Sequence, residues 1–300
     1  MDWMEGQAVL HIIWNPVAGN GKAMKTFSIV EEALKARGEA YCASRSEFPA
    51  HAVELAKDAV KNGDSPIVAL GGDGTVREVA SALFGTDAVM GIMPCGTGND
   101  LSRALNIPND PIQALELILG GEARCMDAAK ANDELYFNIA GFGFDVDVLD
   151  YTEIYKKKTK NGSLAYIRGL LRAITGQKTR KTIITTPEGV IEKDVLVMVA
   201  ANGTHFGGGM RVAPTADPFD GLLDVCIIHS VNFFSLLGLL TNLKSGNHIK
   251  SKKYVTYLRA TEVTASCEPV SRLDVDGEVM PGTPVTFRIL PQSLNVIPGR

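Results

Sequence analysis

Two glycine-rich segments in this sequence each contain an aspartate and follow an apolar run. Gly71-Gly72-Asp73-Gly74-Thr75 comes after Pro66–Leu70, and Gly96-Thr97-Gly98-Asn99-Asp100 comes after Val89–Met93. Glycines let a backbone approach a phosphate, and amides at the start of a following helix can donate hydrogen bonds to it. The two segments therefore indicate a phosphate-binding site in which Asp73 orients Mg²⁺ or a hydroxyl group. A glycine turn with a helix-capping aspartate also explains either segment taken alone.

A third polar loop, Asn15-Pro16-Val17-Ala18-Gly19-Asn20-Gly21-Lys22, follows the apolar run Ala8–Trp14. It has neither the GxxxxGK[ST] pattern of a P-loop nor the GxGxxG pattern of a dinucleotide-binding turn. In open α/β sheets, ligands bind in a crevice at the carboxyl ends of the parallel strands. We therefore expect all three loops to lie at one crevice.

The elements that position these loops alternate between strands and helices. Expected strands are Ala8–Trp14, Glu39–Ala43, Pro66–Leu70 and Val89–Met93, and expected helices are Met24–Arg37, Ala50–Asn62 and Thr75–Phe84. This alternation predicts an α/β domain with a parallel sheet that is covered by helices on both faces.

After about residue 121 the pattern changes to strands separated by glycine- and proline-rich turns. Expected strands are Leu135–Ile139, Lys181–Thr186, Asp194–Ala200, Leu222–His229, Tyr254–Ala260 and Pro284–Ile289, with helices near Gly162–Ile174 and Val231–Lys244. This composition predicts an antiparallel β-sandwich. A chain of 300 residues usually forms more than one core. We therefore expect domains at residues 1–127 and 128–285, with residues 286–300 returning to the first domain.

Composition limits the partners and the compartment. A net charge of −4 gives no basic field for nucleic acid. The five cysteines form no CxxC pair, which predicts reduced thiols in the cytoplasm. The apolar stretch Val231–Leu243 is shorter than the roughly 20 residues that span a bilayer, so any membrane contact is expected to be peripheral, at the inner membrane face. The sequence does not determine whether the chain forms a homodimer.

The three loop motifs, NPxxGxGK, GGDGT and GTGND, resemble in order and spacing the catalytic domain of the diacylglycerol kinase and sphingosine kinase superfamily, including the soluble bacterial diacylglycerol kinases. The resemblance covers essentially the whole chain. It implies a Rossmann-like domain of the NAD kinase and phosphofructokinase type, followed by a β-sandwich. It also implies an ATP-dependent lipid kinase that uses Mg²⁺ and phosphorylates a diacylglycerol-like lipid at the membrane surface, in phospholipid metabolism.

The resemblance assigns nucleotide contacts in the first domain. They are Asn15, Pro16, Gly19, Ser46, Gly71, Gly72, Asp73, Gly74, Thr75 and Thr97. Ser46 follows from the likeness of the segment Ser46–Ala52 to the stretch after the family's second strand. One departure is Arg77-Glu78, which stands where the family commonly has Asn-Glu.

A turn in the second half, Ala213–Asp224, resembles the family's metal-binding turn. By that likeness Asp217, Asp220 and the carbonyl of Leu222 hold a structural Mg²⁺, which water connects to Asp100. Oxygen ligands on a tight turn suit Mg²⁺ or Ca²⁺. A solvated acidic turn is the alternative interpretation.

Two further segments resemble the family's acceptor site. The segment Asp274–Glu278 matches its DGE motif, which implies that Glu278 accepts the proton of the lipid hydroxyl, with Asp73 as the second catalytic residue. A hairpin turn explains the same residues structurally. The segment Gly141–Asp145 matches a GxGxD stretch, which implies that Asp145 binds the lipid head group; Asp127 is a further substrate-binding candidate.

Two alternatives remain at this stage. One is an NAD kinase, which shares the GGDGT loop and a similar two-domain build, and the other is a catalytically silent lipid-sensing protein. The basic run Lys156–Lys160 could attract an anionic membrane, at about 1 kcal/mol for each basic residue near the surface. The acceptor lipid, whether diacylglycerol, phosphatidylglycerol, a sphingoid base or a polyprenol, is not determined by the sequence.

Overall fold

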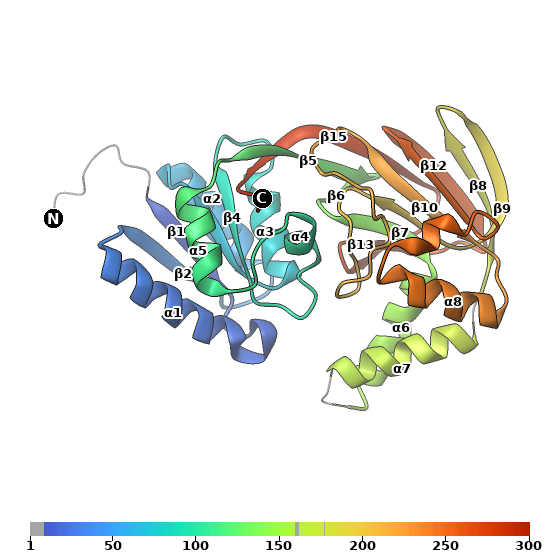
Figure 1. Cartoon of the computed structure of the whole chain (residues 1–300), viewed down its shortest axis with the longest axis horizontal. Helices are drawn as coiled ribbons and strands as arrows, with labels where there is room; N and C mark the ends of the chain where they lie inside the picture. Colours follow the sequence, from blue (N-terminus) through green and yellow to red (C-terminus); the bar gives the residue numbers. More distant parts are fainter. Residues whose placement is uncertain (1–8, 160–161, 177) are drawn as a thin grey trace.

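The first domain is an α/β unit in which helices lie on both sides of a parallel sheet (Figure 1). The computed structural model of the chain describes residues 9–159, 162–176 and 178–300. In chain order the elements of this domain are β1 (Leu10–Trp14), the 3₁₀ helix η1 (Ala18–Gly21), α1 (Lys22–Arg37), β2 (Tyr41–Arg45), α2 (His51–Asn62), β3 (Ile67–Gly71), α3 (Asp73–Leu83), β4 (Val89–Pro94), α4 (Asp100–Ala104) and α5 (Pro111–Gly120).

The parallel sheet has the strand order β2-β1-β3-β4. Because successive residues of a strand point to opposite faces, its buried strands supply two cores. Ile12 and Val68 pack with side chains of α1 and α5, whereas Ile13 and Ala69 pack with side chains of α2 and α3. This architecture confirms the α/β domain that the sequence predicts.

The second domain is built mainly from antiparallel strands. Its elements are β5 (Arg124–Ala131), β6 (Glu134–Tyr136), β7 (Ile139–Gly143), α6 (Phe144–Lys156), α7 (Gly162–Thr175), β8 (Arg180–Thr186), β9 (Gly189–Ala201), β10 (Leu223–His229), α8 (Phe233–Leu243), η2 (Asn247–Lys250), β11 (Val255–Ala260), β12 (Glu262–Glu268), β13 (Leu273–Val275), β14 (Glu278–Met280) and β15 (Val285–Val296). Their pairing confirms the expected antiparallel domain. No helix in the described part of the chain is long and apolar enough to cross a membrane.

Helices α6, α7 and α8 lie together beside the sheet of the second domain (Figure 1). Phe144 of α6, Ala173 of α7 and Leu239 of α8 belong to one buried cluster with Leu196 and Val199 of β9. The sequence predicts α7 and α8 but not α6, whose apolar residues reach the same cluster.

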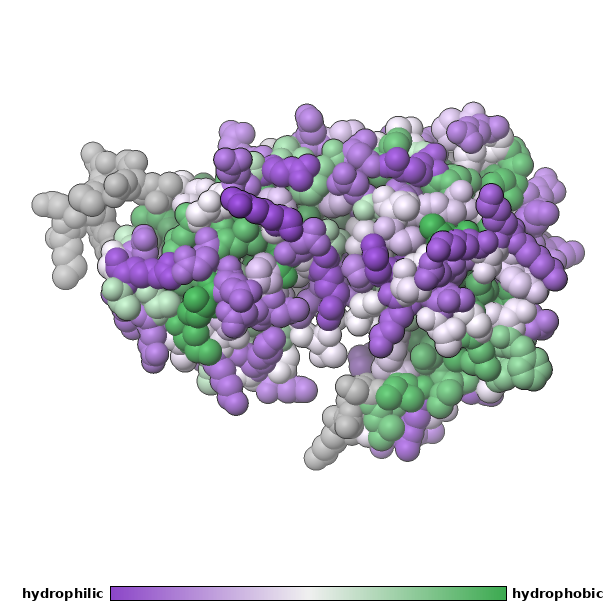
Figure 2. All heavy atoms as spheres, viewed as in Figure 1, coloured by the Kyte–Doolittle hydropathy of each residue, from purple (hydrophilic) through white to green (hydrophobic). Residues whose placement is uncertain are grey.

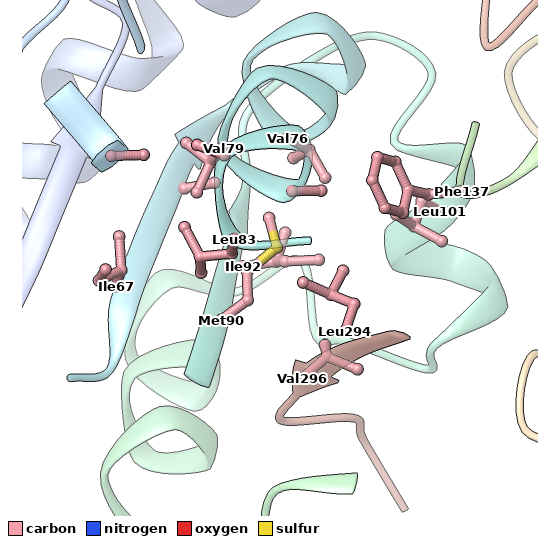
Figure 3. Packing of buried hydrophobic residues seen from close by; sticks show 14 of the residues in the cluster. Ile67, Val76, Val79, Leu83, Met90, Ile92, Leu101, Phe137, Leu294 and Val296 are labelled. Atoms are coloured by element: carbon pink, nitrogen blue, oxygen red, sulfur yellow. The ribbon is translucent and has the colours of Figure 1, made fainter. Parts of the chain in front are cut away.

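Strands β5 and β15 connect the two domains. They pair along their length, and β15 also pairs with β12 in the second domain and, at Asn295 and Val296, with β4 in the first. Both strands run across the top of the molecule in Figure 1. In Figure 3, Leu294 and Val296 lie beside Met90 of the first domain, within one buried cluster. The two domains therefore share strands, and the boundary expected at residue 127 falls inside β5.

Because Leu294 of β15 is buried in the core of the first domain, we expect a shorter side chain at this position to destabilise the protein strongly. This side chain is 1% exposed, so Leu294→Ala should lower the free energy of unfolding by about 2–5 kcal/mol in urea titrations. Val190→Ala is the control, because Val190 is 60% exposed and should change stability by less than about 0.5 kcal/mol. Equal stability of the two variants would contradict the packing of β15 into the first domain.

Candidate active site

The three polar loops that follow β1, β3 and β4 touch one another through their backbones. Gly19 has a φ of 61°, and a Cβ on it would lie 1.9 Å from the carbonyl oxygen of Cys95. A Cβ on Gly96 would lie 2.7 Å from the Cα of Gly72. Both positions therefore require glycine, because any side chain would separate the loops. The structure thus brings the three predicted loops to one edge of the sheet.

Two residues of the predicted nucleotide set make hydrogen bonds near the carboxyl end of β1. Asn15 Nδ2 donates a hydrogen bond to Thr75 Oγ1 at 3.3 Å. The backbone amide of Ser46 donates to the carbonyl of Trp14 at 2.9 Å, so the buried Ser46 lies beside the same strand end. Thr97 lines the cavity in front of the loops.

Asp73 holds the loops after β3 and β4 together. Its Oδ2 accepts a hydrogen bond from the backbone amide of Asn99 at 2.8 Å, and its Oδ1 accepts one from the amide of Asp100 at 2.7 Å. A carboxylate has about four acceptor positions, so each oxygen keeps a free lone pair. Asp73 also lines the cavity, so it can bind Mg²⁺ while it positions the neighbouring loop.

Asp100 extends this connection to the second domain. Its two carboxylate oxygens accept hydrogen bonds from the backbone amides of Gly208 and Gly209, each at 2.9 Å. Burial raises the pKa of Asp100, and the nearby charge of Asp73 raises it further, whereas the two glycine amides oppose these effects.

A cavity of about 1160 Å³ extends from these loops into the second domain. Its volume exceeds the range of about 300–1,000 Å³ that is usual for small-molecule sites. The polar end is formed by Asp73, Arg77, Thr97, Asp100, Asn138, Asp145, Asp274 and Asp276. The apolar part is formed by Val148, Leu170, Leu196, Val199, Phe206, Met210, Ile228, Leu236, Leu239 and Leu243. The cavity can therefore hold a molecule with a polar head and a long apolar part.

Besides Asp100 and Asp276, two further carboxyl groups of the cavity, those of Asp145 and Asp274, have raised pKa values. Burial is the main cause of both increases. The negative charge of Asp274 raises the pKa of Asp145 further. The charge of Asp276 adds to the effect of burial at Asp274, whose pKa rises to about 7. Asp276 itself accepts hydrogen bonds from three consecutive backbone amides, those of residues 137–139. Asp145 thus lies at the polar end of the cavity, where the sequence predicts it. Asp274 also lines this end, but the sequence analysis names it only as the first residue of the Asp274–Glu278 segment.

Glu278 lies at the edge of this site on β14. Its side chain is 58% exposed and forms an ion pair with Arg77, which lines the cavity. The departure from the family pattern at Arg77 thus places a cation beside the predicted proton acceptor.

Asp127 lies elsewhere, in contrast to the expected contact with substrate. It is 1% exposed, and its two oxygens accept hydrogen bonds from the backbone amides of Gly221 at 2.7 Å and Gln292 at 2.8 Å. Asp127 therefore connects the turn before β10 to a bend in β15, and it does not line the cavity.

In the turn that the sequence predicts to bind a metal ion, one aspartate forms an ion pair with an arginine. Asp217 and Asp220 accept hydrogen bonds from the backbone amides of Phe219 and Leu222 within the turn, and the second oxygen of Asp220 pairs with Arg259. Nowhere in the described ranges do three His, Cys, Asp or Glu side chains converge to hold a metal ion. Arg259 occupies one oxygen of Asp220 in this arrangement, so a structural Mg²⁺ at the turn stays a prediction and would have to replace this ion pair.

Comparisons with known proteins agree with the two domains. Residues 9–131 match the model of the diacylglycerol kinase catalytic domain, and residues 138–298 match that of the YegS C-terminal NAD kinase β-sandwich-like domain. A probable lipid kinase, YegS-like, of Pseudomonas aeruginosa is 32% identical over 98% of this chain and 95% of its own length. A diacylglycerol kinase of Bacillus subtilis is 28% identical over 95% of both chains. A crystal structure of a diacylglycerol kinase from Bacillus anthracis superimposes on this chain with a TM-score of 0.75 at 21% identity, over 99% of this chain and 98% of that one. The two proteins therefore have the same fold.

The two hydrogen bonds of Asp73 predict that Asp73→Asn destabilises the protein. An amide has one acceptor oxygen, so its NH₂ group would face a backbone amide donor, and the free energy of unfolding should fall by about 1–3 kcal/mol. Asp87→Asn is the matched control, because Asp87 is exposed. Equal urea midpoints for the two variants would show that Asp73 does not hold the loop.

The raised pKa of Asp274 predicts a pH-dependent stability. Because the folded value of about 7 exceeds the unfolded value of about 3.9, the folded state binds more protons between them, and stability falls as the pH rises through that window. Asp274→Asn keeps an oxygen for the amide of Gly277 and removes this titration. The variant should therefore lose less stability than wild type between about pH 4 and pH 7 in thermal unfolding. Identical stability profiles against pH for wild type and Asp274→Asn would contradict a raised pKa at Asp274.

Proposed function

The chain belongs to the family that joins a diacylglycerol kinase catalytic domain to a YegS-type β-sandwich, and we propose that it transfers the γ-phosphoryl group of ATP to the hydroxyl of a diacylglycerol-like lipid. As a member of this family it is a phosphotransferase with an alcohol acceptor. The proposed acceptor rests on one observation: the cavity of about 1160 Å³ is polar at the glycine loops and apolar between α6, α7 and α8. The apolar part favours a lipid over NAD, because NAD has no hydrocarbon chain that could fill it.

ATP is proposed to bind with its phosphates against the loops after β1, β3 and β4. Their backbone amides and the start of α3 supply donors for the phosphate oxygens. Mg²⁺ bound with the nucleotide would neutralise negative charge on the triphosphate, and Asp73 has the free lone pairs to hold it. Because phosphoryl transfer depends mainly on positioning, the hydrogen bonds that hold Asp100 and Asn99 on Asp73 support turnover directly.

The acceptor lipid is proposed to place its chains in the apolar part and its head near Asp145 and Asp274. The raised pKa values favour the neutral acid forms, which can donate hydrogen bonds to ester and hydroxyl oxygens. Glu278 is the proposed proton acceptor for the reacting hydroxyl, and its ion pair with Arg77 fixes it at the cavity edge. An uncharged head group agrees with this arrangement.

Contact with the membrane is proposed to occur through the helices that cover the cavity. The exposed apolar side chains on α6, α7 and α8 are Ile154, Leu164, Ile167, Leu171, Phe233, Phe234 and Leu237. Figure 2 shows an apolar area over α7 and α8 at the lower right of the molecule. Lys156 is the last residue of α6, Lys157 and Lys158 follow it, and Lys160 lies outside the described residues. A peripheral contact there would bring the cavity wall to the lipid surface.

A transfer assay tests the proposed reaction. The purified protein is given Mg²⁺, γ-labelled ATP and mixed micelles of hydroxyl lipids and, separately, NAD. We expect label in a chloroform-soluble product, and a rate about 10²–10⁴-fold lower for Glu278→Gln, because a general base contributes that much. Glu262→Gln, an exposed glutamate paired with Arg288, is the matched control and should keep the wild-type rate.

Two outcomes would contradict the proposal. Label only in NADP would make the chain an NAD kinase, and no transfer to any acceptor would favour a lipid-sensing role. A wild-type rate for a folded Glu278→Gln variant would remove Glu278 as the proton acceptor while leaving the lipid kinase reaction in place.

A further inference from the structure

A second cavity of about 540 Å³ lies between the two domains. Arg103 of α4, Arg124 of β5 and Arg211 contribute to its lining, together with His205, and its one carboxylate comes from Asp217. In Figure 1, α4 and the C-terminus both lie where the domains meet. None of the residues placed in the nucleotide or lipid site lines this second cavity.

The three arginines of this cavity are not held in ion pairs within the described residues. Within residues 9–159, 162–176 and 178–300, none of the three forms an ion pair with a carboxylate. Arg103 Nε donates to the carbonyl of Gly98 at 3.1 Å, and Arg211 Nη2 donates to the carbonyl of Pro214 at 3.2 Å. Because a guanidinium has five N–H donors, most of them remain available.

Arg124 is held against an aromatic ring, and Arg211 has a buried donor without a partner. The guanidinium of Arg124 lies 3.8 Å from the ring centroid of Phe219, which fixes its plane by a cation–π contact. The Nε of Arg211 is buried and has no hydrogen-bond acceptor in the structure. Burial lowers the pKa of His205, and the charges of Arg211 and Arg103 lower it further, so both guanidinium groups lie near this ring. An unpaired buried donor next to several cations indicates a site built for an anion.

The second cavity shares its walls with the first. Asp100 and Arg103 both lie on α4, and they line the first and the second cavity, respectively. The segment 204–211 likewise contributes Phe206 and Gly208 to the first cavity, and His205 and Arg211 to the second. Because Arg103 donates to Gly98, an anion held by Arg103 would act on the loop that carries Asn99 and Asp100.

We propose that this second cavity binds a phosphomonoester group. A dianionic phosphate offers oxygen acceptors to several guanidinium forks at once, and the planar fork matches its geometry in a bidentate manner. The cavity volume leaves room for the molecule that carries the phosphate, which is either a small polar phosphomonoester or the head group of a lipid phosphomonoester.

Calorimetric titration tests the site with the full chain, Mg²⁺ and saturating ADP, which fills the phosphate loops of the first cavity. In one arm the titrant is glycerol 3-phosphate; in the other, binding to phosphatidylcholine vesicles with and without phosphatidic acid is measured by flotation. We expect binding in at least one arm, about tenfold weaker for Arg124→Gln and for Arg211→Gln, because each variant loses charged hydrogen bonds. Arg288→Gln, which removes an arginine paired with Glu262 outside the cavity, should bind as wild type.

The arm in which the two variants lose binding identifies whether the phosphomonoester is free or carried by a lipid. Arg124 is exposed and Arg124→Gln should unfold at the wild-type temperature, so its loss of binding cannot arise from misfolding. Wild-type affinity in both variants, or no binding by the wild-type protein in either arm, would overturn the proposal.

Discussion

The two hydrogen bonds from the backbone amides of Asn99 and Asp100 to the carboxylate of Asp73 are the interaction on which the site depends. They hold the loops after β3 and β4 in one arrangement, and Asp100 then accepts two amides from Gly208 and Gly209 of the second domain. Because buried carboxylates are costly unless backbone donors satisfy them, this chain of contacts favours one relative position of the two domains. In that position, residues of both domains form the polar end of the large cavity.

The continuous strands β5 and β15 make this arrangement stable. They belong to both domains, and the buried Asp127 adds a connection between β15 and the turn before β10. The α/β domain can therefore present its phosphate loops to a cavity whose apolar walls come from α6, α7, α8 and β9. A hydroxyl on an amphipathic lipid would meet the nucleotide at this junction, while its chains stay away from water.

The sequence predicts the first domain well because its signals are local: apolar runs such as Pro66–Leu70, helical spacing, and glycines such as Gly38 that end helices. It does not predict β5, which depends on its pairing with β15 over 150 residues away, or α6, whose helical form depends on packing against α7 and β9. The candidate site shows the same difference between features with local sequence signals and features that depend on distant residues. Motif order predicts that the loops converge, whereas the pairing of Asp220 with Arg259 and the inward position of Asp127 depend on partners far along the chain.

In the proposed reaction, the apolar part of the cavity holds the chains of the acceptor while its hydroxyl reacts at the glycine loops. The most direct test is kcat/KM for a series of monomeric diacylglycerols that differ only in chain length. Because each buried CH₂ is worth about 0.8 kcal/mol, kcat/KM should rise by up to about fourfold per added CH₂ that enters the cavity, and then level off when the cavity is full. A kcat/KM that does not depend on chain length would contradict the binding of the acceptor chains in this cavity.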